Sequence, residues 1–136
     1  MARRYLKFTI PINPVPASRP RVSKWGCYYS KTYTAFRKAA PEAIEEAVTK
    51  AGVGRSDLPL SQTVECEFVF NFKQPKSTKL AYPRADVDNC LKAIQDSIQD
   101  IILVDDNQIT IVKGEKRWAE KGQEGFIEMK LRIVDS

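Results

Sequence analysis

Alternating apolar and polar positions predict four β-strands along the chain. These segments are residues 4–12, 63–72, 108–118 and 124–134. Pro11 near the end of the first segment indicates that this strand lies at a sheet edge. Only a short turn, residues 120–123, separates the last two segments. We therefore expect these two strands to pair with each other as a β-hairpin.

Apolar residues at helical spacing predict two helices, at residues 32–51 and 88–100. Thr32 or Thr34 is the candidate N-cap of the first helix. Pro41 lies inside it, and a proline at that place predicts a kink or a helix built in two pieces. The second helix follows a proline-containing basic loop and carries one apolar stripe.

The segment between the first strand and the first helix has a different character. The prolines of residues 13–21 exclude a helix or a central strand there, and residues 22–29 predict a short hairpin that turns at Trp25-Gly26. The full order of elements predicts an α+β fold, a small mixed β-sheet with two main helices packed on it. A length of 136 residues fits a single domain, residues 1–136.

Positive charge is concentrated in two acid-free stretches. Residues 1–41 hold nine of the 22 Lys and Arg and none of the 17 Asp and Glu, and residues 68–85 hold four more basic residues and no acid. Clustered positive charge predicts a polyanionic partner, although an ordinary solvated basic surface would give a similar pattern. The candidate DNA-contacting residues are Arg19, Arg21, Lys24, Lys73, Lys76, Lys79 and Arg84.

The cysteine and histidine content excludes several kinds of chemistry. The chain has three well-separated cysteines and no histidine, so a structural zinc site and any catalytic triad with histidine are ruled out. Hydrolysis would have to use carboxylates, lysine or a bound metal. We find neither a signal peptide nor a membrane span in the sequence, and we expect a cytoplasmic protein with no membrane partner.

The segment around Asp86, Asp88 and Lys92 carries the strongest chemical signal. In an extended chain the two carboxylates would share one face, where they would repel each other unless a cation such as Mg²⁺ intervened. Lys92 lies one helical turn after Asp88, within reach of a phosphate. A structural alternative treats Asp88 as the helix N-cap, with an Asp88–Lys92 ion pair. That alternative leaves Asp86 unexplained.

A second acidic pair, Asp105-Asp106, follows the second helix. One interpretation is a turn, in which Asp and Asn are common. The other is a further metal ligand. The second interpretation requires the chain to fold back toward the helix that follows Asp88.

Together these residues form the pattern R-x-D-x-D-N-x-x-K-A, then a helix, then D-D-x-Q. The pattern resembles the RusA family of Holliday junction resolvases, most specifically over residues 84–109. The resemblance implies a homodimer that resolves four-way DNA junctions by paired Mg²⁺-dependent nicks in recombination and repair. The implied catalytic residues are Asp86, Asp88, Lys92 and Asp106, with the three aspartates as metal ligands and Asp105 as a ligand in an alternative alignment.

Two other functions fit the same residues. One is a non-catalytic module that binds branched or single-stranded nucleic acid, and the other is a Mg²⁺-dependent nuclease of flaps or RNA. The aromatic residues also have two interpretations, because each would either stack on unpaired bases or pack within the fold. These residues are Trp25, Tyr28, Tyr29 and Trp118.

Overall fold

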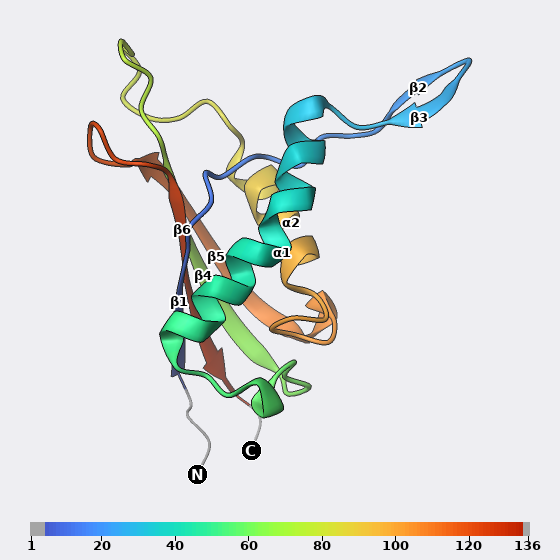
Figure 1. Ribbon diagram of the computed structural model, residues 1–136, viewed down its shortest axis with the longest axis vertical. Coiled ribbons are helices and arrows are strands. Elements are labelled where there is room, and N and C mark those ends of the chain that lie inside the picture. The colour runs from blue at the N-terminus through green and yellow to red at the C-terminus, as the bar shows by residue number, and fades with distance from the viewer. Residues whose placement is uncertain (1–4, 135–136) are drawn as a thin grey trace.

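Two helices lie against one face of a four-stranded β-sheet in the computed structural model, which describes residues 5–134 (Figure 1). The sheet contains β1 (Tyr5–Ile10), β4 (Val64–Phe72), β5 (Ile109–Trp118) and β6 (Phe126–Ile133). The helices are α1 (Lys31–Ala51) and α2 (Val87–Ile98). Strands β2 (Arg21–Ser23) and β3 (Gly26–Tyr28) form a separate hairpin, as predicted. The predicted α+β fold is confirmed.

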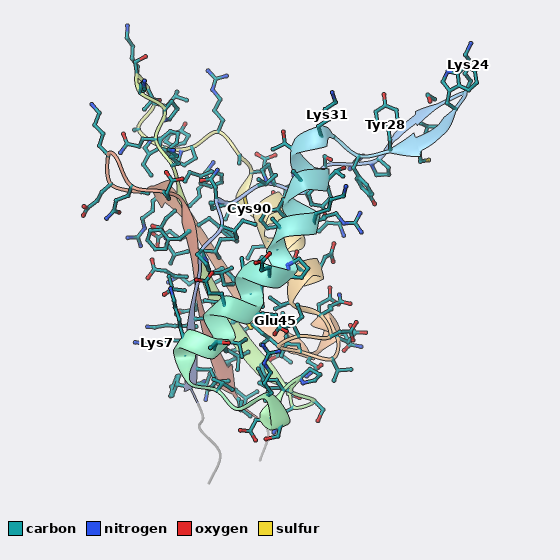
Figure 2. The ribbon with its side chains drawn as sticks, in the orientation of Figure 1. Lys7, Lys24, Tyr28, Lys31, Glu45 and Cys90 are labelled. Carbon is teal, nitrogen blue, oxygen red and sulfur yellow. The ribbon has the colours of Figure 1, made fainter. Side chains whose placement is uncertain are left out.

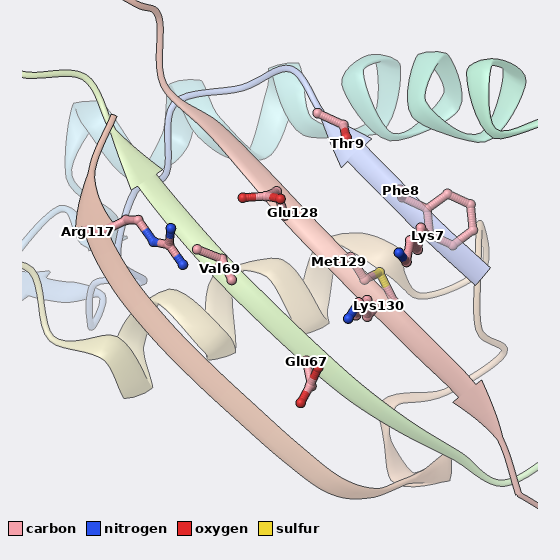
Figure 3. Close-up of a pocket in the computed structure, with 9 residues that line it drawn as sticks. All are labelled: Lys7, Phe8, Thr9, Glu67, Val69, Arg117, Glu128, Met129 and Lys130. Atoms are coloured by element: carbon pink, nitrogen blue, oxygen red, sulfur yellow. The ribbon is translucent and has the colours of Figure 1, made fainter. Parts of the chain in front are cut away.

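The sheet is apolar on one face and polar on the other. Side chains on the apolar face alternate along β1, β4 and β6 and pack under the helices; they include Phe8, Phe68, Phe70, Met129 and Leu131. The opposite face carries charged and polar side chains around a shallow pocket (Figure 3); among them are Lys7, Glu67, Glu128 and Lys130. This division explains the strict alternation of the sequence, because only one face of the sheet is covered. No helix among residues 5–134 is long and apolar enough to cross a bilayer.

The predicted pairing of the last two strands is wrong. The strand order is β1-β6-β4-β5, so β4 lies between β5 and β6. Helix α2 carries the chain from β4 back to a parallel β5, a connection that parallel strands require. The remaining edge of β4 is then taken by β6, which runs antiparallel to it and brings its apolar residues into the core. The turn itself forms, with Gln123 N donating to Glu120 O at 2.9 Å, but it passes the end of β4.

Helix α1 differs from the prediction at its start and at Pro41. Its N-cap is Ser30, whose hydroxyl accepts a hydrogen bond from Tyr33 N at 3.2 Å, and neither Thr32 nor Thr34 has that role. The helix is a single element that continues across Pro41. The proline lies on the exposed side of the helix, where water can bond the carbonyl group that proline leaves without a partner. Gly52 ends the helix with a φ of +73°, a conformation that favours glycine.

Candidate active site

The two motif carboxylates lie at the start of α2. Asp86 is the N-cap residue, with φ −73° and ψ 131°, and Asp88 is already inside the first turn. Both predictions for this segment are therefore corrected: Asp88 is not the N-cap, and the pair does not lie along one extended strand. The Asp88 carboxylate accepts a hydrogen bond from Asn89 N at 3.0 Å, and Asn89 Nδ2 donates to Asp86 at 3.5 Å. Both carboxylates are exposed at the positive end of the helix dipole.

Gly114 of β5 sets how closely this part of α2 approaches the sheet. A Cβ atom at residue 114 would lie 2.9 Å from a side-chain carbon of Leu91 and 3.0 Å from one of Val87. Both residues belong to the first two turns of α2. The absence of a side chain at Gly114 thus allows the start of α2 to pack closely against β5.

A lysine from the neighbouring strand reaches the segment just before the carboxylates. Lys116 Nζ on β5 donates to Ala85 O at 2.8 Å. Beneath the helix start, burial raises the pKa of the Cys90 thiol to about 12. Lys116 acts against this rise, whereas the Asp86 and Asp88 carboxylates add to it.

Lys92 pairs with a residue that the sequence analysis did not select. Its Nζ lies 3.5 Å from Oδ2 of Asp96, one turn further along α2. In residues 5–134 no Asp88–Lys92 ion pair forms. The structural alternative is therefore wrong, because Asp88 is neither the N-cap of α2 nor the partner of Lys92. Asp88, Lys92 and Asp96 follow one another at intervals of four residues and so lie along one face of α2.

The second acidic pair is held in place by Gln108. Asp105 caps the short 3-10 helix η2 (Asp106–Gln108), and its own N–H donates to Gln108 Oε1 at 2.8 Å. The other end of the Gln108 amide donates to Leu60 O and Gln62 O, both at 2.8 Å. These bonds fix the turn to the segment before β4. The glutamine of the D-D-x-Q pattern therefore has a structural explanation.

The Asp106 carboxyl, in the turn after α2, lies within electrostatic range of Lys92 and Asp96. Partial desolvation raises the pKa of the Asp106 carboxyl above its usual value, and Asp105 and then Asp96 raise it further. Lys92 acts in the opposite direction. However, no three Asp, Glu or Cys side chains within residues 5–134 converge closely enough to form a complete metal cage.

The basic residues selected from the sequence divide into two groups. Most are exposed and take part in no ion pair among the described residues; these are Arg19, Lys24, Lys76, Lys79 and Arg84. Lys73 instead pairs with Glu124 at 2.7 Å, which weakens its candidacy for DNA binding. The side chain of Arg21 lies outside the described part of the structure. Figure 2 places Lys24 at the tip of the β2–β3 hairpin and Lys31 at the start of α1.

The aromatic residues also fall into two groups. Trp25 and Tyr28 on the hairpin are exposed. Trp118 is half-buried, and its Nε1 donates to Leu80 O at 3.0 Å, so it packs within the fold. Tyr29 lies edge-on to Tyr33, with 5.3 Å between ring centroids.

Two residues near the candidate site were not selected from the sequence: Asp96 and Lys116. Asp96 was detectable in principle, because it follows Lys92 by one helical turn and has the opposite charge. Lys116 gave no such local signal. It reaches the site only because β5 packs beside α2.

The comparisons with known proteins are consistent with the motif. The family of endodeoxyribonuclease RusA matches residues 11–130, which is most of the chain. No curated protein matches the sequence closely. The matched range includes both helices, every candidate site residue and the whole sheet except β1 and the end of β6. The chain therefore belongs to the RusA family of endodeoxyribonucleases.

Proposed function

We propose that this protein resolves four-way DNA junctions by Mg²⁺-dependent hydrolysis of phosphodiester bonds, in recombination and repair. One observation carries the proposal beyond family membership. A single face of α2 presents Asp88 and Lys92, and Asp106, in the turn that follows α2, lies within electrostatic range of Lys92. A lysine between carboxylates suits a reaction in which a cation and a phosphate must be held side by side.

The donor set suits Mg²⁺. Carboxylate oxygens are the ligands that this ion prefers, and it commonly takes only one or two of them, with water and substrate phosphate completing its coordination. The exposed carboxylates of Asp86 and Asp88, together with Asp106 or Asp105, provide such donors. Partial desolvation and then the neighbouring Asp105 raise the pKa of Asp106, and a bound cation would favour its charged form. When bound, the ion supplies Lewis acidity and lowers the pKa of coordinated water.

The chain's own residues supply positioning and charge. Asn89 donates to both motif carboxylates, through its backbone to Asp88 and through its side chain to Asp86, and so orients them. Lys92 stabilises the negative charge that develops on the scissile phosphate. Asp96 draws the ammonium group of Lys92 toward the C-terminal end of α2.

DNA binding is assigned to the basic residues that the sequence predicted for it. The loop 73–86 and the β2–β3 hairpin both project from the end of the molecule at which α2 begins (Figure 1). Basic contacts of this kind bind the phosphate backbone without reading sequence and weaken strongly with salt. The residues are Arg19, Arg21, Lys24, Lys76, Lys79 and Arg84, with Lys73 in a lesser role because of its ion pair with Glu124.

A homodimer completes the proposal. A four-way junction presents two scissile strands related by approximate twofold symmetry, and each protomer offers one candidate site. Two copies related by a twofold axis would present two sites in matching orientation. Sedimentation of the protein with and without junction DNA tests this, and a monomer under both conditions at micromolar concentration would contradict it.

The function is tested by nicking of a synthetic four-way junction. We expect wild type to make paired symmetric nicks with Mg²⁺ and none in EDTA. Asp88→Asn should bind the junction normally and lose about 100-fold or more of the nicking rate. Asp57→Asn is the matched control, because Asp57 is an exposed aspartate in η1 (Arg55–Asp57), at the end of the molecule away from the start of α2 (Figure 1).

Other substrates separate the alternatives. Faster cleavage of flaps or of RNA than of the junction would indicate a different magnesium nuclease. Tight binding in EDTA without nicking under any divalent cation would indicate a non-catalytic binding module, and the proposed resolvase function would then be wrong.

A further inference from the structure

The β2–β3 hairpin stands away from both helices and from the sheet (Figure 1). Its two strands pair only with each other, over three residue pairs. An isolated hairpin of this size contributes little to folding. Nevertheless it exposes large apolar side chains, with Trp25 at 87% and Val22 at 80% relative exposure. Such exposure on a projecting element indicates a binding role.

The base of the hairpin is attached to the candidate active site. Before the hairpin, Ala17 N donates to Asn89 O at 2.9 Å, in the first turn of α2. The hydroxyl groups of Ser18 and Ser30 lie 3.3 Å apart, and their hydrogen bond joins the segment before the hairpin to the segment after it. Ser30 also caps α1 through Tyr33 N. The hairpin is thus anchored to both helices.

A cluster of aromatic and basic groups connects this base to Lys92. Arg37 lies over the rings of Tyr29 and Tyr33, 5.0 and 5.7 Å from their centroids. Burial raises the pKa of Tyr33, Asp96 raises it further, and Lys92 is among the groups that lower it. Tyr33 on α1 thus contacts Tyr29 and Arg37 near the hairpin base and lies within electrostatic range of Lys92 and Asp96.

The hairpin tip combines a flat aromatic face with positive charge. Lys24 Nζ lies 5.1 Å from the centroid of the Trp25 ring, and Figure 2 shows Lys24 at the far end of the hairpin. The first 41 residues contain no acid. Contact between two copies through this element would bring like charges together, which disfavours a second protomer as its partner. Nucleic acid with unpaired bases offers both the negative charge and the stacking surface.

We propose that the hairpin places Trp25 on an unpaired base at the branch point of branched DNA, while Lys24 and the neighbouring basic residues contact phosphates. This inference rests on the proposed function for the identity of the substrate. The anchoring of the hairpin on Asn89 then sets the separation between the branch point and the Asp86–Asp88 site. The hairpin accordingly determines where along the arm the strand is cut.

Trp25 provides its own probe, because the chain has only two tryptophans. In a Trp118→Phe background, Trp25 is the sole tryptophan, and stacking on a base quenches its emission. We expect strong quenching by a four-way junction in EDTA and much weaker quenching by a linear duplex of the same length. Unchanged emission at saturating junction, or equal quenching by the duplex, would overturn the proposal.

Substitution gives a second measurement. With Trp118 intact, Trp25→Ala should weaken junction binding in EDTA about 5- to 150-fold, the range for losing one base–aromatic stack, and Trp25→Phe should retain most of the affinity. Tyr5→Ala is the matched control, since Tyr5 is an exposed aromatic residue on β1. Circular dichroism should show both variants folded. A change in sedimentation of Trp25→Ala without DNA would assign the hairpin to protein assembly and overturn the proposal.

Nicking assays separate this inference from the proposed function. If wild type fails to nick but Trp25 is quenched by the junction, the catalytic proposal fails and the hairpin assignment stands. If wild type nicks and Trp25→Ala nicks the same positions with unchanged affinity, the hairpin assignment fails and the catalytic proposal stands. If both proposals hold, Trp25→Ala should scatter the nick positions along the arm.

Discussion

Lys92 pairs with Asp96, with 3.5 Å between Nζ and Oδ2, and this pair directs the lysine side chain toward the C-terminal end of α2. The pair is exposed and contributes little to stability. The pair matters because it positions the Lys92 side chain. Asp88, Lys92 and Asp96 lie along one face of α2.

Substitutions at this pair should separate chemistry from positioning. Lys92→Gln should lower the nicking rate about 100- to 1000-fold, the usual loss when a group that stabilises transition-state charge is removed. Asp96→Asn should lower it about 10-fold, because Lys92 loses its orienting partner but keeps its charge. Single-turnover nicking measures both effects. Equal losses for the two variants would show that Asp96 has more than a positioning role.

Gln108 should affect activity through the acidic turn. Gln108→Leu removes three hydrogen bonds, to Asp105 N, Leu60 O and Gln62 O, and should cost about 1–3 kcal/mol of unfolding free energy. The nicking rate should fall as well, since Asp105 and Asp106 lose their support. Urea unfolding and nicking are the two measurements. Asn107→Ala, one residue away and exposed, serves as the control, and similar behaviour of the two variants would contradict this role.

Gly114 should be sensitive to any added side chain. Gly114→Val places atoms against Leu91 and Val87, and such overpacking costs about 1–3 kcal/mol. The displaced helix start should also reduce nicking. The neighbouring Glu115→Ala should change neither property appreciably, because Glu115 is exposed and pairs only with exposed Arg117. Wild-type stability in Gly114→Val would show that α2 adapts without strain.

The buried thiols predict a loss of stability at alkaline pH. Burial raises the pKa of Cys66 from its usual 9.0 to about 12, and that of Cys90 similarly. Because the pKa of each thiol is higher in the folded state, the neutral thiols contribute fully to the free energy of unfolding below pH 9. This contribution is lost as the pH rises toward about 12. Urea midpoints should therefore fall across this window. Cys66→Val should reduce the slope of that fall, and an unchanged slope would contradict the assignment.

Asp106 predicts a link between metal binding and stability. Because the pKa of Asp106 is higher in the folded state, its protonated carboxyl contributes fully to the free energy of unfolding below the usual pKa of 3.8. This contribution is lost as the pH rises, so the charged carboxylate disfavours folding at neutral pH. In EDTA at pH 7, Asp106→Asn should raise Tm by about 1–2 °C. Adding Mg²⁺ should raise the Tm of wild type more than that of the variant. A lower Tm for the variant than for wild type in EDTA would contradict the expectation that the charged Asp106 carboxylate disfavours folding.

Much of the local structure was predictable because it depends on neighbours in sequence. The period of two in residues 63–72 predicted β4, and the proline-rich segment before the β2–β3 hairpin was correctly expected to be irregular. The order of Asp, Asn, Lys and Gln in residues 84–108 pointed to the RusA family, which the family match confirms. The roles of Asp86, Asp88, Lys92 and Asp106 stay predictions until the variants are assayed.

The sequence determined by itself where strands and helices form, where charge gathers and which family the chain belongs to, because periodicity, residue type and motif order are properties of short segments. Only the tertiary structure decided that β4 separates β5 from β6, that Asp106 comes within electrostatic range of Lys92, and that the segment before the hairpin is bonded to Asn89. Each of these depends on contacts between segments far apart in the chain. Such contacts are chosen by how backbone hydrogen bonds and apolar faces are satisfied together in the folded molecule, and no local pattern specifies that choice.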